Sequence, residues 1–343
     1  MRFSVVIPAH NGEQYLRESI LSALRQSRRA DEIIVVDDAS TDGTAAILTE
    51  YRECIKCCYN AEATGFADAW NRSVALASGD FVTILHQDDI LYPEYLKHIE
   101  NALKSFPSVK HFYAACDYID EHGKVVRRPP GPHSLEPILY SGNEYARNYL
   151  NGVTTNRHIH RCPGVTTQRQ LLLNECTYRK EAGHIADDDF FLRVGAFTKV
   201  VGISQAMASY RLHSASATSR VDSLAFKLAQ DYVFQARYHK EDRTLLESED
   251  IIKINLQAVK FINLLLFQAL RQHRKVWVEK ALSLRSELDE IVPLFMEQNL
   301  PFWAAKMWSI ASPIGRNSLA TLYVKFLDGM IRARDLIMSR RQK

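Results

Sequence analysis

Nearly continuous apolar runs alternate with helical patterns over roughly the first quarter of the chain. The runs cover residues 3–9, 32–36 and 81–85 and alternate little with polar residues, which is typical of parallel strands buried on both faces. Between the first two runs, apolar residues recur at spacings of three and four over residues 13–26, which predicts a helix with one face on a sheet. The pattern therefore predicts an α/β fold, with a mostly parallel central sheet flanked by helices.

A second group of elements extends this sheet. Residues 109–115 have the pattern of a strand and 120–126 that of a hairpin, so antiparallel additions to the sheet are expected. The proline-rich segment 127–137 is expected to be irregular. Residues 140–180 show no regular pattern, and a further strand is predicted at 200–203.

The pattern changes after residue 220. Helical spacing covers residues 224–238, 248–271 and 276–292, without strands between them. We therefore predict two parts, an α/β domain at residues 1–220 and an α-helical C-terminal extension at residues 221–343.

The far end of the extension is basic and amphipathic. Between residues 317 and 338 an apolar stripe runs beside Lys325, Arg332 and Arg334. Such segments lie on anionic membrane surfaces or pack on partner proteins. We expect attachment to an anionic membrane surface or homo-oligomer formation through these C-terminal helices, with docking against the first domain as the alternative.

Composition narrows the class of protein. The 343 residues suffice for one large α/β domain with an appendage, and a net charge of +3 describes an ordinary globular protein without a nucleic-acid partner. No signal-peptide pattern opens the chain, and the apolar run at 261–270 is shorter than the roughly 20 residues that span a bilayer. We expect a cytoplasmic protein, held at most peripherally on the inner face of the membrane. The six cysteines lack paired CxxC spacing and are expected to be free thiols.

Adjacent acids follow two of the predicted strands. Asp37 and Asp38 end the second run, and Asp88 and Asp89 follow the third after a short connection. In open α/β sheets, ligands bind beyond the carboxyl ends of parallel strands. Hard divalent cations take carboxylate oxygens and keep positions free for phosphate oxygens. These acids therefore predict a cation and phosphate site, and a solvated acidic turn is the alternative for Asp88 and Asp89.

A third acidic cluster opens a predicted helix. Asp187, Asp188 and Asp189 precede the segment Phe190 to Val194. Acids in a first turn interact favourably with the helix dipole, which accounts for one or two of them better than for all three. Capping therefore explains this cluster only in part.

Four segments together resemble the family 2 glycosyltransferases with the GT-A fold. They are residues 5–11 (VVIPAHN), 35–44 (VVDDASTDGT), the pair Asp88 and Asp89, and Asp187 ahead of FFLR at 190–193. The resemblance covers about residues 1–215 and implies an inverting, metal-dependent, hexosyltransferase-type enzyme of surface polysaccharide or glycolipid synthesis. Such enzymes move a sugar from a nucleotide-diphosphate sugar donor to a glycan or lipid-linked acceptor, usually with Mn²⁺ or Mg²⁺.

The resemblance also implies roles for individual residues. The backbone of Pro8 and Ala9, together with Asp38, would contact the donor base. Asp88 would lie near the ribose or sugar, and Asp89 would hold the metal. His213 would contact the diphosphate, and Asp187 would be the catalytic base. Two positions depart from the family pattern, because His86 stands where an acid is common and Ala186 where a Glu often precedes the base. If the register is shifted, Asp188 or Asp189 takes the place of Asp187.

The chemistry of an inverting displacement requires the same division of roles. Inversion by direct displacement needs a base near the acceptor hydroxyl on the face opposite the leaving diphosphate. A divalent cation stabilises the charge that gathers on this leaving group. Two other functions stay open, a polyprenyl-phosphate sugar transferase and a non-catalytic nucleotide-sugar-binding assembly subunit, although the retention of Asp38, Asp88 and Asp89 argues against the second.

Overall fold

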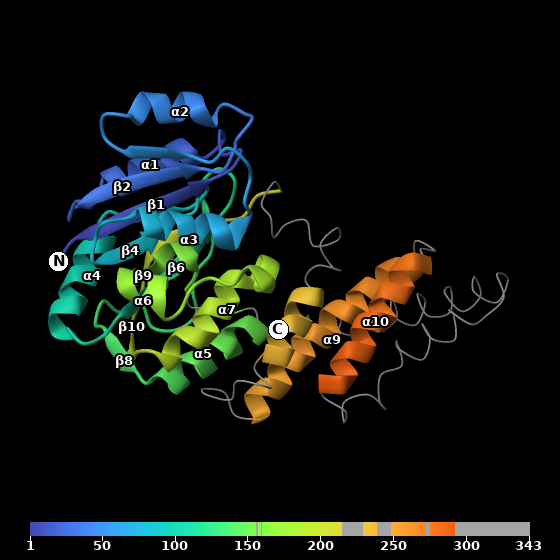
Figure 1. Cartoon of the computed structure of the whole chain (residues 1–343). Helices are drawn as coiled ribbons and strands as arrows, with labels where there is room; N and C mark the ends of the chain where they lie inside the picture. The colour runs from blue at the N-terminus through green and yellow to red at the C-terminus, as the bar shows by residue number, and fades with distance from the viewer. Residues whose placement is uncertain (156, 159, 215–228, 239–247, 272–274, 292–343) are drawn as a thin grey trace. The chain divides into compact units, whose positions relative to one another are not determined.

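The computed structural model describes residues 1–155, 157–158, 160–214, 229–238, 248–271 and 275–291 (Figure 1). These residues fall into two compact units. One holds the sheet and its helices, and the other holds helical residues 229–238 with α10 and most of α9. The basic stripe predicted between residues 317 and 338 lies outside the described residues.

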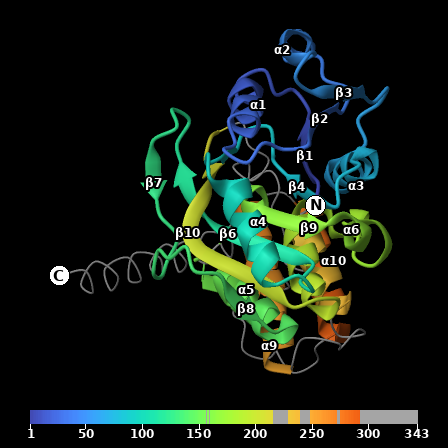
Figure 2. The same ribbon diagram turned by 90° about the vertical axis from the view of Figure 1, so that its left-hand side faces the viewer.

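The first unit is built on one sheet, in the order β3-β2-β1-β4-β9-β6-β10-β5, with β7 beside β6 and β8 beside β10. Its strands are β1 (Phe3–Ala9), β2 (Glu32–Asp37), β3 (Lys56–Tyr59), β4 (Phe81–Ile84), β5 (Ile90–Leu91), β6 (His111–Ile119), β7 (Val125–Arg127), β8 (Ile138–Tyr140), β9 (Val165–Gln168) and β10 (Val200–Arg211). The first four strands pair in parallel, as do β6 and β10, whereas β9 runs antiparallel between β4 and β6. Figure 2 shows the long, curved β10 beside β6. The predicted α/β fold with a mostly parallel core and antiparallel additions is therefore confirmed.

Helices cover the sheet on both faces. In the first unit the helices are α1 (Leu16–Leu24), α2 (Thr44–Tyr51), α3 (Phe66–Leu76), α4 (Tyr95–Ser105), α5 (Gly142–Thr155), α6 (Arg169–Asn174) and α7 (Ala186–Arg193). The extension contains α9 (Ser248–Arg271) and α10 (Lys275–Ile291). Apolar residues of α1, α2 and α4 share one core with Val5, Val35 and Phe112 of the sheet. The helix α3 contacts β1 and β2, and the neighbouring strand residues Val6 and Val36, which point to the opposite side from Val5 and Val35, are buried as well. Burial on both faces explains the continuous apolar runs of these strands.

The segment without a sequence pattern contains α5 and β9. The strand β9 carries Thr166 and Thr167 in the core, where both are buried. The Thr166 hydroxyl lies 2.6 Å from that of Thr83 and 2.9 Å from that of Tyr95. Because these hydroxyls are paired, polar residues are tolerated there, and the strand shows no apolar run. The strand predicted at residues 200–203 also proves longer, since β10 continues through two register shifts to Arg211.

A buried polar face of α1 holds the chain that follows β4. The Ser19 hydroxyl bonds to the carbonyl oxygens of Gln87 at 2.8 Å and Asp89 at 2.7 Å. Ser22 on the same face and Gln26, just beyond the end of the helix, bond to the backbone of residues 91–96. These contacts fix the loop after β4 relative to the first helix.

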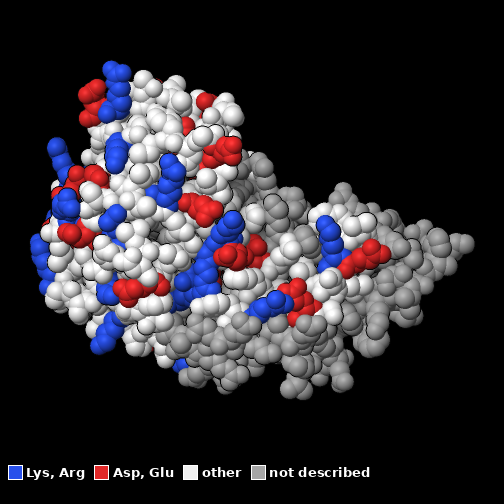
Figure 3. Space-filling model, viewed as in Figure 1, with Lys and Arg blue, Asp and Glu red and all other residues white. Residues whose placement is uncertain are grey.

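Three further observations describe the chain as a whole. No helix among the described residues is long and apolar enough to cross a membrane. All six cysteines are free thiols, as predicted. On the face drawn in Figure 3, basic and acidic side chains are interspersed over the described residues.

Candidate active site

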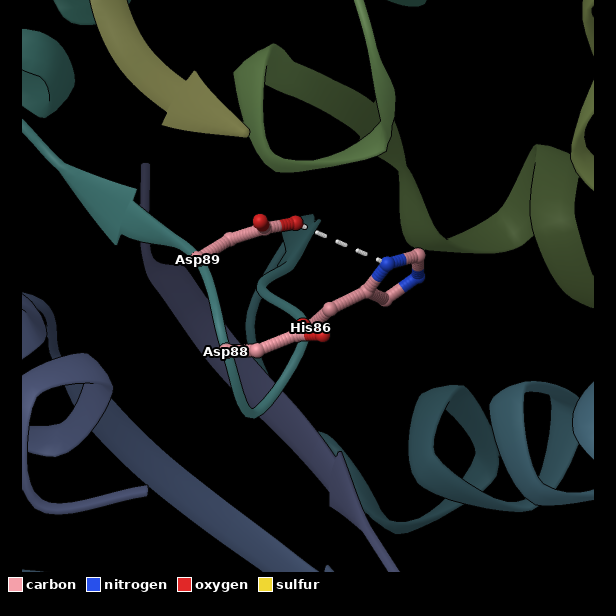
Figure 4. A group of neighbouring side chains, drawn as sticks. All are labelled: His86, Asp88 and Asp89. Atoms are coloured by element: carbon pink, nitrogen blue, oxygen red, sulfur yellow. Dashed lines mark ion pairs between the residues drawn. The ribbon is translucent and has the colours of Figure 1, made fainter. Parts of the chain in front are cut away.

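Residues 85–89, here called the acid loop, connect β4 to the short strand β5. The Asp89 side chain is fully buried, and its Oδ1 accepts a 2.9 Å hydrogen bond from the Arg211 backbone N–H. Its Oδ2 has no hydrogen-bond partner among the described residues and lies 3.7 Å from Nδ1 of His86 (Figure 4). Burial, together with the charge of Asp88, raises the pKa of Asp89 well above its usual range. A cation beside this carboxylate would offset that penalty.

Asp88 lies at the more open side of the acid loop. Its carboxylate is 22% exposed, and Oδ2 lies 2.9 Å from Nε2 of His213. The His213 ring in turn meets the edge of the Tyr15 ring, with centroids 4.8 Å apart. The structure therefore brings together Asp88 and His213, which were predicted to contact the donor.

The His86 side chain is about as exposed as that of Asp88, at 21%. Its ring stacks on Trp70 with centroids 5.1 Å apart, and burial lowers its pKa, so the imidazole is neutral at neutral pH. Its Nε2 is buried, and none of the described residues hydrogen-bonds to it. A neutral imidazole offers a lone pair to a cation.

These three side chains fit a divalent cation. His86, Asp88 and Asp89 present ligand atoms that all lie within 4.8 Å of one another. The unpartnered, buried Oδ2 of Asp89 is the feature that a bound cation would satisfy. Carboxylate and imidazole ligands suit Mn²⁺, and carboxylates alone suit Mg²⁺.

The residues predicted to meet the donor base lie at the ends of β1 and β2. Pro8 and Ala9 pair with β2, and the Ala9 carbonyl accepts a 2.7 Å bond from the Asp38 N–H. The Asp38 carboxylate accepts bonds from the Asn60 amide at 2.6 Å and from the backbone N–H and hydroxyl of Thr64. Although burial opposes them, these bonds hold the pKa of Asp38 below its usual range. Asp38 thus anchors the loop after β3, and its contact with the donor's nucleotide base stays a prediction.

The three acids of α7 have different surroundings. Asp188 is buried and accepts a 2.5 Å hydrogen bond from the Tyr149 hydroxyl, while Asp189 is paired with Arg193 at 2.8 Å. Asp187 is partly exposed, and its carboxylate accepts a 2.9 Å hydrogen bond from the backbone N–H of Asp188. Burial raises the pKa of Asp187, with the charge of Arg161 opposing the shift. Among the three acids, Asp187 has no side-chain hydrogen-bond partner in the described part of the chain.

Comparison with known proteins shows what parts of the chain resemble. Residues 4–165 match the family described as "Glycosyl transferase family 2". This segment belongs to glycosyltransferase family 2. Two uncharacterized glycosyltransferases resemble the chain, one of Rickettsia typhi at 33% identity over 155 residues and one of Rickettsia prowazekii at 28% over 221 residues. The matches cover 44% and 63% of this chain and 48% and 65% of the relatives, so the chain spans between about half and two thirds of their length.

Solved structures confirm the predicted GT-A fold. S. aureus TarS 1-349 in complex with UDP-GlcNAc superposes with a TM-score of 0.59 at 17% identity, covering 95% of this chain and 92% of TarS. The same protein in complex with UDP gives a TM-score of 0.53 at 18% identity, covering 89% of this chain and 90% of TarS. At such identities the likeness concerns the fold.

Sequence reasoning missed several neighbours of the site. Tyr149, the partner of Asp188, lies in the segment that showed no pattern. Trp70 reads as an apolar residue of α3 and gives no sign that it stacks on His86. Arg211 follows Tyr210 as a single basic residue, and only the structure shows its contacts with the acid loop.

Proposed function

We propose that this chain is an inverting glycosyltransferase that transfers a sugar from a nucleoside-diphosphate sugar to an acceptor hydroxyl. The observation that carries the proposal is the presence of two acidic groups with different surroundings. One is the acid loop, with its buried Asp89 carboxylate oxygen, and the other is α7; among the described residues, neither that oxygen nor the Asp187 carboxylate has a side-chain hydrogen-bond partner. The charges of Asp89 and Asp187 both act on the Cys162 thiol, which supports their bordering one region.

In this proposal, the acid loop holds a divalent cation, Mn²⁺ or Mg²⁺, on the donor diphosphate. Asp89 would hold the cation, with Asp88 and His213 beside the donor. When bound, the cation supplies Lewis-acid stabilisation of the leaving nucleoside diphosphate. The ends of β1 and β2, with Pro8, Ala9 and Asp38, would receive the base. The complexes of S. aureus TarS with UDP-GlcNAc and UDP support a UDP-sugar as the donor.

Asp187 is proposed as the general base. A base must be ionised to accept the acceptor proton, and it works best when its pKa approaches the working pH. The raised pKa of Asp187 has this direction. Asp188 and Asp189 are held by Tyr149 and Arg193, which favours Asp187 over both neighbours.

The acceptor and the cellular setting form the wider part of the proposal. We assign residues 1–220 to catalysis and residues 221–343 to a separate helical extension. The acceptor would be a growing surface polysaccharide or a glycolipid, used by a cytoplasmic enzyme. The basic stripe between residues 317 and 338 would seat it on an anionic membrane surface or join two copies.

A ligand screen followed by a transfer assay tests the proposed function. Thermal unfolding is measured with UDP- and GDP-sugars, with and without Mn²⁺, because a donor at one hundred times its dissociation constant stabilises by about 2.7 kcal/mol. Release of nucleoside diphosphate on adding acceptor then separates an enzyme from a binding subunit. A product on polyprenyl phosphate would identify a carrier-loading transferase, and the absence of stabilisation by any nucleotide sugar would refute the proposal.

A further inference from the structure

Arg211 connects three parts of the first unit at the edge of the acid loop. Its side chain is fully buried, and Nε donates to the Asp88 carbonyl at 2.9 Å. Nη1 donates to the carbonyls of Asp120 and Glu121, at 3.3 Å each. Nη2 donates to Oε2 of Glu18 at 2.6 Å. The Arg211 backbone N–H donates to the Asp89 carboxylate, so Arg211 contacts both acidic residues of the acid loop.

These contacts leave the guanidinium little capacity for a phosphate. All three nitrogens already donate to protein oxygens, and the Tyr15 ring lies 4.5 Å from the guanidinium carbon. The charge of Arg211 is thus directed into the protein. Arg211 therefore acts through other residues.

Glu18 is the carboxylate that pairs with this buried charge. A buried guanidinium needs a partner, because an unpaired charge in low dielectric is costly. Among the described residues, Glu18 is the acid whose side chain lies within ion-pair distance of Arg211. The Arg211 charge also acts on the Asp89 carboxylate and favours its ionised form. Without Glu18, the guanidinium would be drawn toward the carboxylates of the acid loop.

One turn of α1 supports both sides of this arrangement. Glu18 pairs with Arg211, and the adjacent Ser19 bonds to the carbonyls of Gln87 and Asp89. The Tyr15 ring, just ahead of the helix, contacts the Arg211 guanidinium and the His213 ring. The helix thus fixes the acid loop and the end of β10 relative to each other.

We infer that Glu18 and Arg211 are positioning residues for the cation site. Glu18 neutralises Arg211 and keeps it turned away from the acid-loop carboxylates, so that their negative charge is left for a divalent cation. This inference rests on the proposed function, since it needs a cation at the acid loop. It assigns a role to an exposed residue of α1 that touches neither the cation nor the donor.

The chain offers a matched control for the test. Glu50 pairs with Arg17 at 2.6 Å, and its side chain is 52% exposed, as is that of Glu18. Glu18→Ala and Glu50→Ala each remove one half-exposed carboxylate from an arginine, but only the first arginine contacts the acid loop. Circular dichroism and thermal unfolding establish that both variants are folded.

Mn²⁺ affinity in the presence of UDP is then measured from the electron paramagnetic resonance signal of free Mn²⁺. Glu18→Ala is expected to weaken Mn²⁺ binding by about tenfold or more, as for other residues that orient metal ligands, whereas Glu50→Ala keeps the native affinity. Glu18→Gln keeps an acceptor oxygen without the charge, and we expect it to weaken Mn²⁺ binding as well. Raising Mn²⁺ should restore turnover of Glu18→Ala, because the catalytic groups are intact.

Two results would overturn the inference in distinguishable ways. Equal Mn²⁺ affinity of Glu18→Ala, Glu50→Ala and the native protein would show that Glu18 has no positioning role, while leaving the proposed function in place. If the native protein with UDP binds no Mn²⁺, the cation site itself is wrong, and the inference falls with it.

Discussion

The imidazole of His213 lies 2.9 Å from the carboxylate of Asp88, although 125 residues separate the two in the chain. The sheet brings them together. Directly after the acid loop, β5 pairs antiparallel with β10, with Ile90 opposite Ser209. The ends of the acid loop and of β10 must therefore meet at one edge of the sheet, and the predicted donor contacts at residues 88 and 213 become neighbours.

The first prediction concerns the metal. Asp89→Asn keeps an oxygen to accept the Arg211 N–H but removes the charge that would hold a cation. We expect loss of detectable transfer and weaker Mn²⁺-dependent binding of UDP, measured by calorimetry. Asp117→Asn is the control, because Asp117 is also a buried acid but hydrogen-bonds with Tyr92. Full transfer activity in excess EDTA would show that no cation is needed.

The sequence predicts the parts of this site that follow a local apolar pattern and misses the parts that depend on partners far away in the chain. The strands β1, β2 and β4 are buried on both faces, so their apolar runs predict them, and the acid loop follows from the last run. The strand β9 could not be found in this way, because Thr167 pairs with His111 at 2.8 Å and needs no apolar neighbour in sequence. The role of Arg211 depends on Glu18, which lies 193 positions away. No local pattern reports such a pair.

A second prediction links Asp188 to stability. Burial, with the charge of Asp187, raises the pKa of Asp188 from 3.8 to about 7. In the unfolded chain this carboxyl ionises near its usual pKa, so between these two values the folded state binds more protons. The free energy of unfolding should therefore fall as the pH rises from about 4 to about 7.

Asp188→Asn cannot ionise, and its amide oxygen can still accept the Tyr149 hydroxyl. Between about pH 5 and about pH 7.5, its unfolding temperature should fall less than that of the native protein. Asp68→Asn changes an exposed acid of α3 and should keep the native pH dependence. Parallel stability curves for Asp188→Asn and the native protein would contradict the predicted linkage.

The third prediction concerns the basic stripe between residues 317 and 338. If it seats the enzyme on acidic lipid, binding to vesicles that contain phosphatidylglycerol should weaken as salt rises, because exposed charges are screened over about 10 Å at 0.1 M. Replacing Lys325, Arg332 and Arg334 by Gln should reduce sedimentation with such vesicles. Equal sedimentation with neutral and anionic vesicles would point to packing or oligomer formation instead.

The last prediction concerns the base. Asp187→Asn keeps nearly the same shape but cannot accept the acceptor proton, so kcat should fall by roughly 10² to 10⁴. Donor affinity should change little, because the proposed donor contacts lie on the acid loop and at the ends of β1 and β2. Single-turnover transfer and calorimetric UDP binding, measured on the same variant, separate chemistry from binding.

Asp188→Asn and Asp189→Asn are the controls for this assignment. Asp188→Asn can keep its hydrogen bond with Tyr149, whereas Asp189→Asn loses the charge that pairs with Arg193 and should loosen α7 and lower the unfolding temperature. In the described part of the chain Asp187 has no side-chain hydrogen-bond partner to lose, so Asp187→Asn should unfold near the native temperature. A large loss of kcat at native stability is the signature of a base, and it should be found at residue 187. If Asp188→Asn or Asp189→Asn shows this signature while Asp187→Asn turns over at the native rate, the base is the neighbour.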